Sequence, residues 1–366
     1  EVAAEVFTEL EDSDDQERLI NALSDKELRE VLDELYMDDT VDLIEDMPAN
    51  VVSRILRNTD ASTRTQINQL LNYPKDSAGS IMTTEYVYLH PNATVEESFA
   101  RIRKVGMDKE TVYTCYVTQR RVLLGVVTVR RMLLASYDTR IGDLMETNVL
   151  SVNTHEDKED VAQLLNKYDL SALPVVDGED RLVGIITFDD AMDVIEEETT
   201  EDFEKMAAMS PSEKPYLRTG VFTLARHRIV WLLVLMVSGT ITGGILGRYE
   251  AAFSAMPLLV TFIPMLTDTG GNAGSQSSTL IIRGMAVGEI RLRDFGKVFW
   301  KELRVSMLVG LVLSAVNFVR LMITYPGNHM VALTVALALF VTVMLAKTVG
   351  GVLPMAAKLC HADPAI

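Results

Sequence analysis

Residues 229–247 read IVWLLVLMVSGTITGGILG, nineteen positions without a charge between Arg228 and Arg248. At a rise of about 1.5 Å per residue, a helix of this length crosses a hydrocarbon core of about 30 Å. Further apolar runs cover about 251–282, 303–323 and 330–355. Together the runs predict a multi-pass membrane protein with an α-helical transmembrane bundle in which four spans are visible.

Charge divides the chain into two unlike halves. Residues 1–218 contain 46 Asp and Glu against 22 Lys and Arg, whereas residues 219–366 contain 6 against 12. A half this acidic lacks the basic surface that nucleic-acid binding requires, and it should attract cations. Two distant cysteines, Cys115 and Cys360, suit a reduced compartment. The five histidines show neither nucleophile nor metal spacing, so we expect that the chain is not an enzyme.

Lys and Arg residues predict the orientation in the membrane, because cytosolic loops carry an excess of them. They precede the first apolar run and crowd the loop between the second and third, at Arg226, Arg228, Arg283, Arg291, Arg293, Lys297, Lys301 and Arg304. The other two connections are nearly free of basic residues. We therefore expect the acidic N-terminal half in the cytosol.

The second apolar run contains a polar string, TDTGGNAGSQ, at 267–276, preceded by Pro264. We expect its prolines and glycines to open the helix and free carbonyls, which a membrane tolerates only where protein or water satisfies them. An ionisable Asp268 at this depth indicates a functional site. Oxygen donors suit a hydrated Mg²⁺ ion, which gives up water reluctantly. The candidate pore residues are Asp268, Gly270, Gly271, Asn272 and Gln276.

The alternative for this string is structural. Gly270 and Gly274 would then form a small-residue packing seam between helices, and Asp268 would pair with a Lys or Arg at a helix end.

The acidic half begins with short amphipathic helices and continues with a repeat. Apolar spacing in 26–35 and the stop at 47–50 predict helix-turn-helix units over the first 75 residues. Asp38 and Asp39 lie in this segment, where the plain alternative is a solvated helix face. Two stretches of about 60 residues follow, in which SIMTT (80–84) and GVVTV (125–129) match DLMET (143–147) and GIITF (184–188). Each is expected to fold as strand, helix, strand, strand, helix.

The second copy contains LPVVD (173–177) and GIITFDD (184–190), and with these strings the two copies resemble a tandem pair of CBS domains. In that family a Thr-x-x-Asp pattern often holds an adenosine nucleotide, and Thr187 and Asp190 match it. The first copy has Arg131 where the Asp belongs. The resemblance therefore implies at most one nucleotide site per chain, and it leaves ATP binding open because many CBS pairs bind no nucleotide.

The order of segments resembles the MgtE family of magnesium channels, and GGNAGSQ (270–276) followed by SSTLIIRG is the most specific string. The resemblance implies a helical superhelical N-domain, an α/β CBS pair, a connecting helix and a membrane bundle. The expected boundaries are 1–75, 76–138, 139–200, 201–226 and 227–366. The string at 210–215 makes one unbroken connecting helix doubtful.

What the resemblance implies about function is a Mg²⁺-selective channel or transporter in the plasma (inner) membrane. It would be a homodimer in contact with membrane lipid, with Mg²⁺ as transported and regulatory ligand and ATP as a further candidate ligand. The implied sensor carboxylates are Asp157, Glu159, Asp169, Asp190, Glu201 and Asp202, with Asp38 and Asp39 on the N-domain. The family continues into a fifth membrane helix with a pore aspartate, so we expect that the chain is truncated after Ile366.

Two other hypotheses stay open. A carrier of Mn²⁺, Co²⁺ or Zn²⁺ would have a similar layout, although the predicted pore has neither His nor Cys for softer metals. A membrane sensor that reads ATP without transport, or a CBS-regulated anion channel, would share the cytosolic half, although Asp268 disfavours anions.

Overall fold

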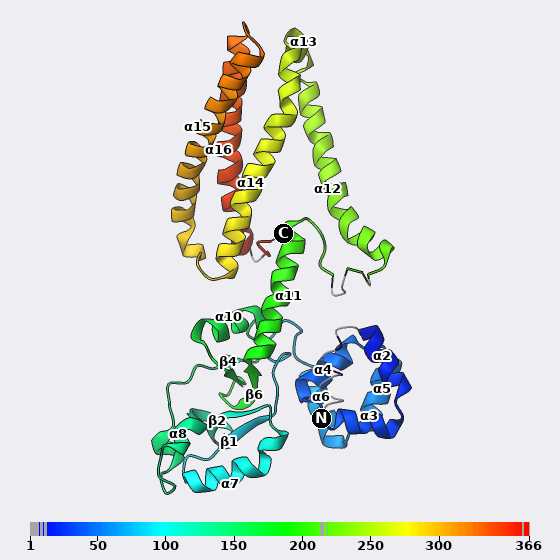
Figure 1. The fold of residues 1–366 in the computed structure, drawn as a ribbon, viewed down its shortest axis with the longest axis vertical. Helices are drawn as coiled ribbons and strands as arrows, with labels where there is room; N and C mark the ends of the chain where they lie inside the picture. Colours follow the sequence, from blue (N-terminus) through cyan, green and yellow to red (C-terminus); the bar gives the residue numbers. More distant parts are fainter. Residues whose placement is uncertain are drawn as a thin grey trace. The chain divides into compact units, whose positions relative to one another are not determined.

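The computed structural model describes residues 7, 10, 13–212, 216–217, 219–360 and 362–365. The chain forms two compact units, Glu1–Glu198 and Thr199–Ile366, which are coloured blue to green and green to red in Figure 1. The first combines an all-α domain with an α/β pair of repeats, and the second is a helical bundle. The predicted fold class is confirmed.

The N-terminal domain consists of short amphipathic helices, as the apolar spacing predicts. Within the described residues these are α2 (Ser13–Ala22), α3 (Asp25–Leu32), α4 (Met37–Asp46), α5 (Ala49–Asn58) and α6 (Ala61–Leu70). Helix α3 starts at a capping box, in which Ser24 and Glu27 satisfy each other's backbone N–H groups. Each of these helices buries at least one apolar side chain, and Ile20, Leu28, Ile55 and Ile67 are fully buried. Burial of these faces holds the short helices together.

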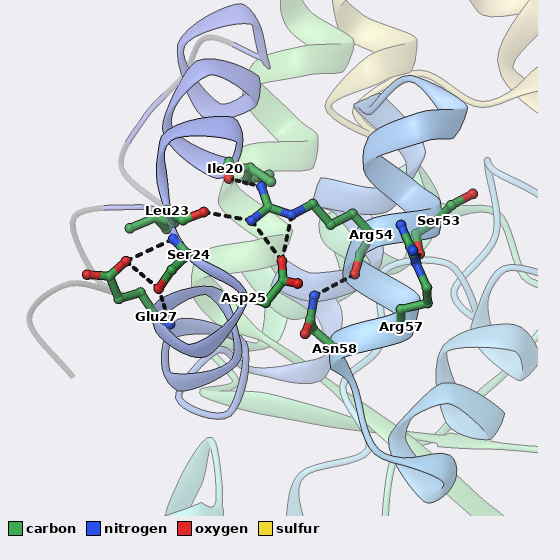
Figure 2. Close-up of polar contacts among 9 residues, drawn as sticks. All are labelled: Ile20, Leu23, Ser24, Asp25, Glu27, Ser53, Arg54, Arg57 and Asn58. Atoms are coloured by element: carbon green, nitrogen blue, oxygen red, sulfur yellow. Dashed lines mark hydrogen bonds and ion pairs between the residues drawn. The ribbon is translucent and has the colours of Figure 1, made fainter.

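Arg54 ties helices of this domain together (Figure 2). Its guanidinium donates to the carbonyl oxygens of Ile20 at 2.5 Å and Leu23 at 2.6 Å, and to Asp25 Oδ1 at 2.9 Å. The two carbonyls lie at the end of α2, where a helix leaves carbonyls without intrahelical partners. Arg54 therefore caps α2 and fixes α5 against it.

The two repeats form separate three-stranded sheets with the same topology. In strand orders β1-β2-β3 and β4-β5-β6, the first pair is parallel and the second antiparallel. The first repeat contains β1 (Tyr86–Leu89), α7 (Val95–Val105), β2 (Thr111–Gln119), β3 (Val122–Thr128) and α8 (Val129–Leu133). The second contains α9 (Ile141–Leu144), β4 (Val152–Asn153), α10 (Lys158–Tyr168), β5 (Ala172–Val176), β6 (Leu182–Thr187) and α11 (Phe188–Met206). The predicted order of elements is therefore present in both copies.

The helix that leaves the second repeat does not continue unbroken into the apolar segment that begins at Val221. Helix α11 passes residue 200 and ends at Met206, Ala208 has a left-handed φ of 57°, and α12 begins at Val221. Residues 207–212 are not helical, and 213–215 lie outside the described residues. The connecting helix predicted over 201–226 is thus interrupted, which agrees with the doubt raised by the Ser-Pro string.

The second unit contains long helices joined by short turns. They are α12 (Val221–Gly247), α13 (Glu250–Ala255), α14 (Ile263–Ala286), α15 (Phe295–Thr324) and α16 (His329–Leu359), with a 3-10 segment η2 at Pro257–Phe262. Of the described helices, those within 221–247, 292–324 and 329–359 are long and apolar enough to cross a membrane. Helix α16 packs against both α14 and α15 (Figure 1). No described residue of α12 is buried.

Helix α14 corrects one expectation. The string 267–276 lies inside a continuous helix, so its carbonyls are used within that helix rather than freed for an ion. Pro264 falls in the first turn, where a missing N–H is tolerated, and the irregular backbone lies earlier, at η2. Close contacts of Gly270 and Gly274 with α16 offset the low helix propensity of these two glycines. The prediction that prolines and glycines open the helix at 267–276 was therefore wrong.

Candidate functional site

One face of α14 is polar and exposed within this unit. Asp268, Gly271, Asn272 and Gln276 all lie on it, at the spacing that places residues on one side of a helix. Asp268 forms no ion pair with any described residue, so a pairing with Lys or Arg at a helix end is not observed. Four of the five predicted pore residues thus lie on one surface, which presents carboxylate and amide oxygens.

Gly270 lies on the opposite side, in the contact between α14 and α16. A Cβ on Gly270 would lie 2.8 Å from Thr342 Cγ2, and one on Gly350 would lie 2.4 Å from the Gly274 carbonyl oxygen. These distances leave no room for side chains. The structural alternative therefore describes Gly270 and Gly274, and Gly270 does not belong to the exposed polar face.

A buried polar contact next to this face was not predicted. Ser277 Oγ donates to Glu302 Oε2 of α15 at 2.7 Å, and Glu302 is only 9% exposed. Lys347 of α16 is 6% exposed, one helical turn before Gly351, whose added Cβ would lie 2.8 Å from Glu302 Cγ. Ionisable groups so buried in a membrane helix indicate function or helix positioning. Glu302 lies one residue before an apolar run, where the sequence gives no signal of burial.

In the first unit, carboxylates from three segments converge. Asp38, Asp39 and Asp42 belong to α4, and Asp190 stands in the first turn of α11 beside Asp189. Glu110 joins them from the segment before β2. The sequence named Asp38, Asp39 and Asp190; Asp42 could have been found from its i, i+4 spacing to Asp38, whereas Glu110 carries no such signal. We refer to these six residues as the acidic cluster.

The acidic cluster repels itself. Burial, followed by the charge of Asp190, raises the pKa of Asp39 to about 6, of Asp42 to about 7 and of Glu110 to about 8. Burial also raises the pKa of Asp190, and that of Asp38 lies well above its usual range for the same reason with Asp190 next. Like charges brought together in this way favour protonation or a bound cation.

Asp38 has the least compensated position in the cluster. Its side chain is 9% exposed, and its Oδ1 finds no hydrogen-bond partner among the described residues. Glu110 Oε2 is likewise buried without a partner there. A buried carboxylate oxygen left unpaired is costly unless a cation or ordered water meets it.

The cluster is not closed into a direct coordination sphere. Across the described parts of the chain, no three His, Cys, Asp or Glu side chains are close enough together to hold a metal ion. Mg²⁺ commonly keeps several waters and binds through one or two carboxylates, so this cluster suits a hydrated Mg²⁺ ion better than a dehydrated one.

The predicted carboxylates of α10 serve local roles instead. Asp157 caps the helix by accepting from the Glu159 backbone N–H at 2.9 Å, and Glu159 accepts from Gln163 Nε2 at 2.9 Å. Asp169 ends the helix with a left-handed φ of 51°. The structure does not bring these three side chains into the acidic cluster.

Glu201 and Asp202 belong to the second unit, near the residues that follow α16. Lys205 Nζ lies 2.7 Å from Glu201 Oε1 and also pairs with Asp363. Burial, followed by the Asp363 charge, raises the pKa of Asp202. A lysine thus already neutralises part of this second acidic group.

The predicted nucleotide residues bind each other. Thr187 Oγ1 donates to Asp190 Oδ2 at 2.5 Å, and the Thr187 backbone N–H donates to the same oxygen at 3.3 Å. Asp190 therefore belongs to the acidic cluster and to the Thr-x-x-Asp pattern at once.

Family models match three parts of the chain: its start, the two repeats and its last hundred residues. One described as "Divalent cation transporter" matches residues 263–366, and one described as "MgtE intracellular N domain" matches 1–76. The CBS domain model matches 78–138 and 141–197.

Curated relatives are similar over most of the chain. The magnesium transporter MgtE of Thermus thermophilus is 39% identical over 308 residues, which cover 84% of this chain and 68% of the relative. The magnesium transporter MgtE of Bacillus subtilis is 32% identical over 330 residues, covering 90% and 72%. A crystal structure of the cytosolic domain of the Mg²⁺ channel MgtE in complex with ATP is 39% identical, with a TM-score of 0.50 over 52% of this chain and 79% of that one.

These relatives are transporters, which confirms the expectation that the chain is not an enzyme. Together with the matched N-domain, CBS pair and transporter segment, they show that this chain belongs to the MgtE family of magnesium transporters.

Proposed function

We propose that the chain forms a Mg²⁺-selective channel whose activity falls when cytosolic Mg²⁺ binds the acidic cluster. The observation that carries the proposal is the buried carboxylate oxygen of Asp38, which has no hydrogen-bond partner among the described residues and lies near the charge of Asp190. Without a cation, α4 and the start of α11 repel each other. With Mg²⁺ and its waters between them, the repulsion becomes attraction and the docked arrangement is favoured.

The ion pathway in this proposal follows the exposed face of α14. Asp268 supplies a negative charge, and Asn272 and Gln276 supply amide oxygens to the water shell of the ion, one and two turns further along. Backbone carbonyls play no part at this position, because the helix uses them. Gly270 and Gly274 instead allow α14 to approach α16 closely, which holds the polar face in place.

The remaining features of the proposal concern the assembly and its ligands. We place the acidic unit in the cytosol and the helical unit in the plasma membrane, as a homodimer in contact with lipid, in agreement with the distribution of basic residues. The domain boundaries predicted from the sequence remain part of the proposal. The other predicted sensor carboxylates, Asp157, Glu159, Asp169, Glu201 and Asp202, would bind Mg²⁺ only after leaving their present local contacts.

ATP is proposed as a second ligand of the CBS pair, because a similar cytosolic domain was crystallised with ATP. At Thr187 and Asp190 its phosphates would meet the negative acidic cluster, so Mg²⁺ should accompany the nucleotide. A calorimetric titration with ATP, with and without Mg²⁺, tests this part separately.

The proposed gating is tested by limited proteolysis of the segment after α11 in wild type and in the Asp38→Asn, Asp42→Asn variant. We expect Mg²⁺ to protect the wild-type segment and to protect the variant only at concentrations about ten-fold higher or more. Equal protection of both proteins would refute regulation by the acidic cluster. Flux of Mg²⁺ compared with Mn²⁺, Co²⁺ and Zn²⁺ in vesicles tests selectivity in the same preparation.

A further inference from the structure

The first repeat has a cavity that neither transport nor Mg²⁺ regulation uses. It has a volume of about 680 Å³ and lies where β1 ends, against α7 and the turn between β2 and β3. Its walls include Tyr86, Tyr88, Arg101, Arg120 and Arg121. This size falls within the range of small-molecule sites, about 300–1,000 Å³.

The turn that borders the cavity has an unusual composition. Arg120 and Arg121 are its two central residues, and both have left-handed backbones, with φ of 54° and 69°. Two-residue turns of this kind favour Asn and Gly, since a side chain beyond Cβ strains a left-handed backbone. Placing arginine at both positions is unfavourable for the turn itself. The presence of arginine at both positions therefore indicates a role other than forming the turn.

The cationic groups of the cavity are only partly compensated by the described part of the protein, since the charge of Arg121 interacts with that of Asp177. Arg101 lies over the Tyr88 ring, 4.2 Å from its centroid, and its Nε is buried without a hydrogen-bond partner there. No ion pair of Arg101, Arg120 or Arg121 is formed among the described residues. Glu97 also lines the cavity, but its Oε2 accepts from the Thr94 backbone N–H at 2.9 Å. The lining thus has three positive charges and one negative charge.

The second repeat shows that the fold does not require these arginines. Its corresponding turn, between β5 and β6, carries Asp177, Glu179 and Asp180. The contact of the Arg121 turn with the second repeat is made by the backbone, since the Leu182 N–H donates to the Arg121 carbonyl oxygen at 2.8 Å. That contact does not depend on the arginine side chain.

The cavity is separate from the Thr187–Asp190 pair. Thr187 lies at the end of β6, whereas Leu182, which borders the cavity, lies at its beginning. A ligand in the cavity would therefore occupy the opposite end of the strand from a nucleotide held by the Thr-x-x-Asp pattern.

We propose that this cavity binds a small phosphate monoester that carries an aromatic or apolar group. Guanidinium groups bind phosphate through paired, charge-assisted hydrogen bonds, and the three arginines can supply them from two sides. The rings of Tyr86 and Tyr88 and the side chain of Leu89 form the apolar wall for the rest of the molecule. The positive charge of the lining excludes the Mg²⁺ that the acidic cluster attracts.

The test is calorimetry on the full chain in detergent with three probes: phenyl phosphate, inorganic phosphate and phenol. We expect phenyl phosphate to bind at least ten-fold more tightly than inorganic phosphate, and phenol to give no measurable heat. The decisive variant is Arg120→Asn with Arg121→Gly, which removes both charges while supplying the residues that this turn favours, so it should fold at least as well as wild type. It should weaken phenyl phosphate binding ten-fold or more.

The matched control is Arg103→Gln with Lys104→Gln, which removes two exposed positive charges from the same repeat without touching the cavity. It should bind phenyl phosphate like wild type, as should Thr187→Ala. Absence of binding to wild type by either phosphate probe would overturn the proposal. So would unchanged binding in the Asn-Gly variant, or an equal loss in the control.

Discussion

Replacing Glu110 with Gln should stabilise the cytosolic unit, because it removes one charge from the acidic cluster without changing the size of the side chain. Burial, followed by Asp190 and other carboxylates, raises the pKa of Glu110 from 4.5 to about 8. At 1.36 kcal/mol per pKa unit this rise corresponds to about 5 kcal/mol. Because Glu110 is half-buried, we reduce the figure for solvent screening to about 2 kcal/mol.

The pH dependence has a defined direction. The pKa of Glu110 is higher in the folded than in the unfolded state. The contribution of Glu110 to the free energy of unfolding is therefore complete below about pH 4.5 and is lost as the pH rises through about 8. Wild type and the Glu110→Gln variant should therefore differ little at pH 4.5 and by about 2 kcal/mol at pH 9. For a unit of about 200 residues this difference raises the unfolding midpoint by roughly 6 °C.

The assay is thermal unfolding of the cytosolic unit at pH 4.5, 7 and 9, with a chelator or with Mg²⁺. The control is Glu196→Gln on α11, which removes an exposed carboxylate of the same charge. Mg²⁺ at pH 9 should raise the midpoint of wild type more than that of Glu110→Gln, because less repulsion remains to be relieved. Equal midpoints for Glu110→Gln and Glu196→Gln at pH 9 would refute the self-repelling cluster.

Substitutions at five further positions test the membrane unit and the N-domain. Asp268→Asn should reduce Mg²⁺ flux into vesicles ten-fold or more with an unchanged unfolding midpoint. A variant with the same flux as wild type would show that Asp268 is not part of the ion pathway. Gly350→Ala should cost about 2 kcal/mol in detergent unfolding, because its Cβ meets a backbone oxygen of α14 at 2.4 Å, whereas Gly271→Ala, with open space around it, should be near neutral. Glu302→Leu should cost about 2 kcal/mol by leaving a buried hydroxyl without its acceptor, and Glu302→Gln clearly less. Arg54→Met should cost about 2–3 kcal/mol in the unfolding of the N-domain, since it loses the capped carbonyls of α2; a loss below about 0.5 kcal/mol would contradict the capping role.

Local patterns were sufficient to predict most elements of this chain. Apolar spacing such as that at 26–35 predicts the short helices of the N-terminal domain, and the repeated strings predict two sheets of the same topology. The error at 267–276 came from applying residue propensity to a segment that packs against another helix. There the close contact of Gly274 with Gly350 decides the conformation, and such a contact between distant residues leaves no local signal.

In the candidate site, too, local patterns were predictable and contacts between distant residues were not. Asp268, Asn272 and Gln276 follow from a polar string at membrane depth, and their shared face follows from helical spacing. The acidic cluster was only partly predictable, because Glu110 reaches it through the packing of one domain on another. Glu302 is buried by tertiary contacts that its flanking sequence does not indicate.

The most direct test of the account is Mg²⁺ flux through the protein in proteoliposomes while Mg²⁺ on the cytosolic side is varied. Wild type is compared with the variant that combines Asp38→Asn, Asp42→Asn and Asp190→Asn. We expect full flux at low cytosolic Mg²⁺ in both, strong inhibition of wild type as Mg²⁺ rises, and inhibition of the variant shifted ten-fold or more to higher Mg²⁺. Identical inhibition of the two proteins would contradict the central claim that the acidic cluster is the Mg²⁺ sensor of this transporter.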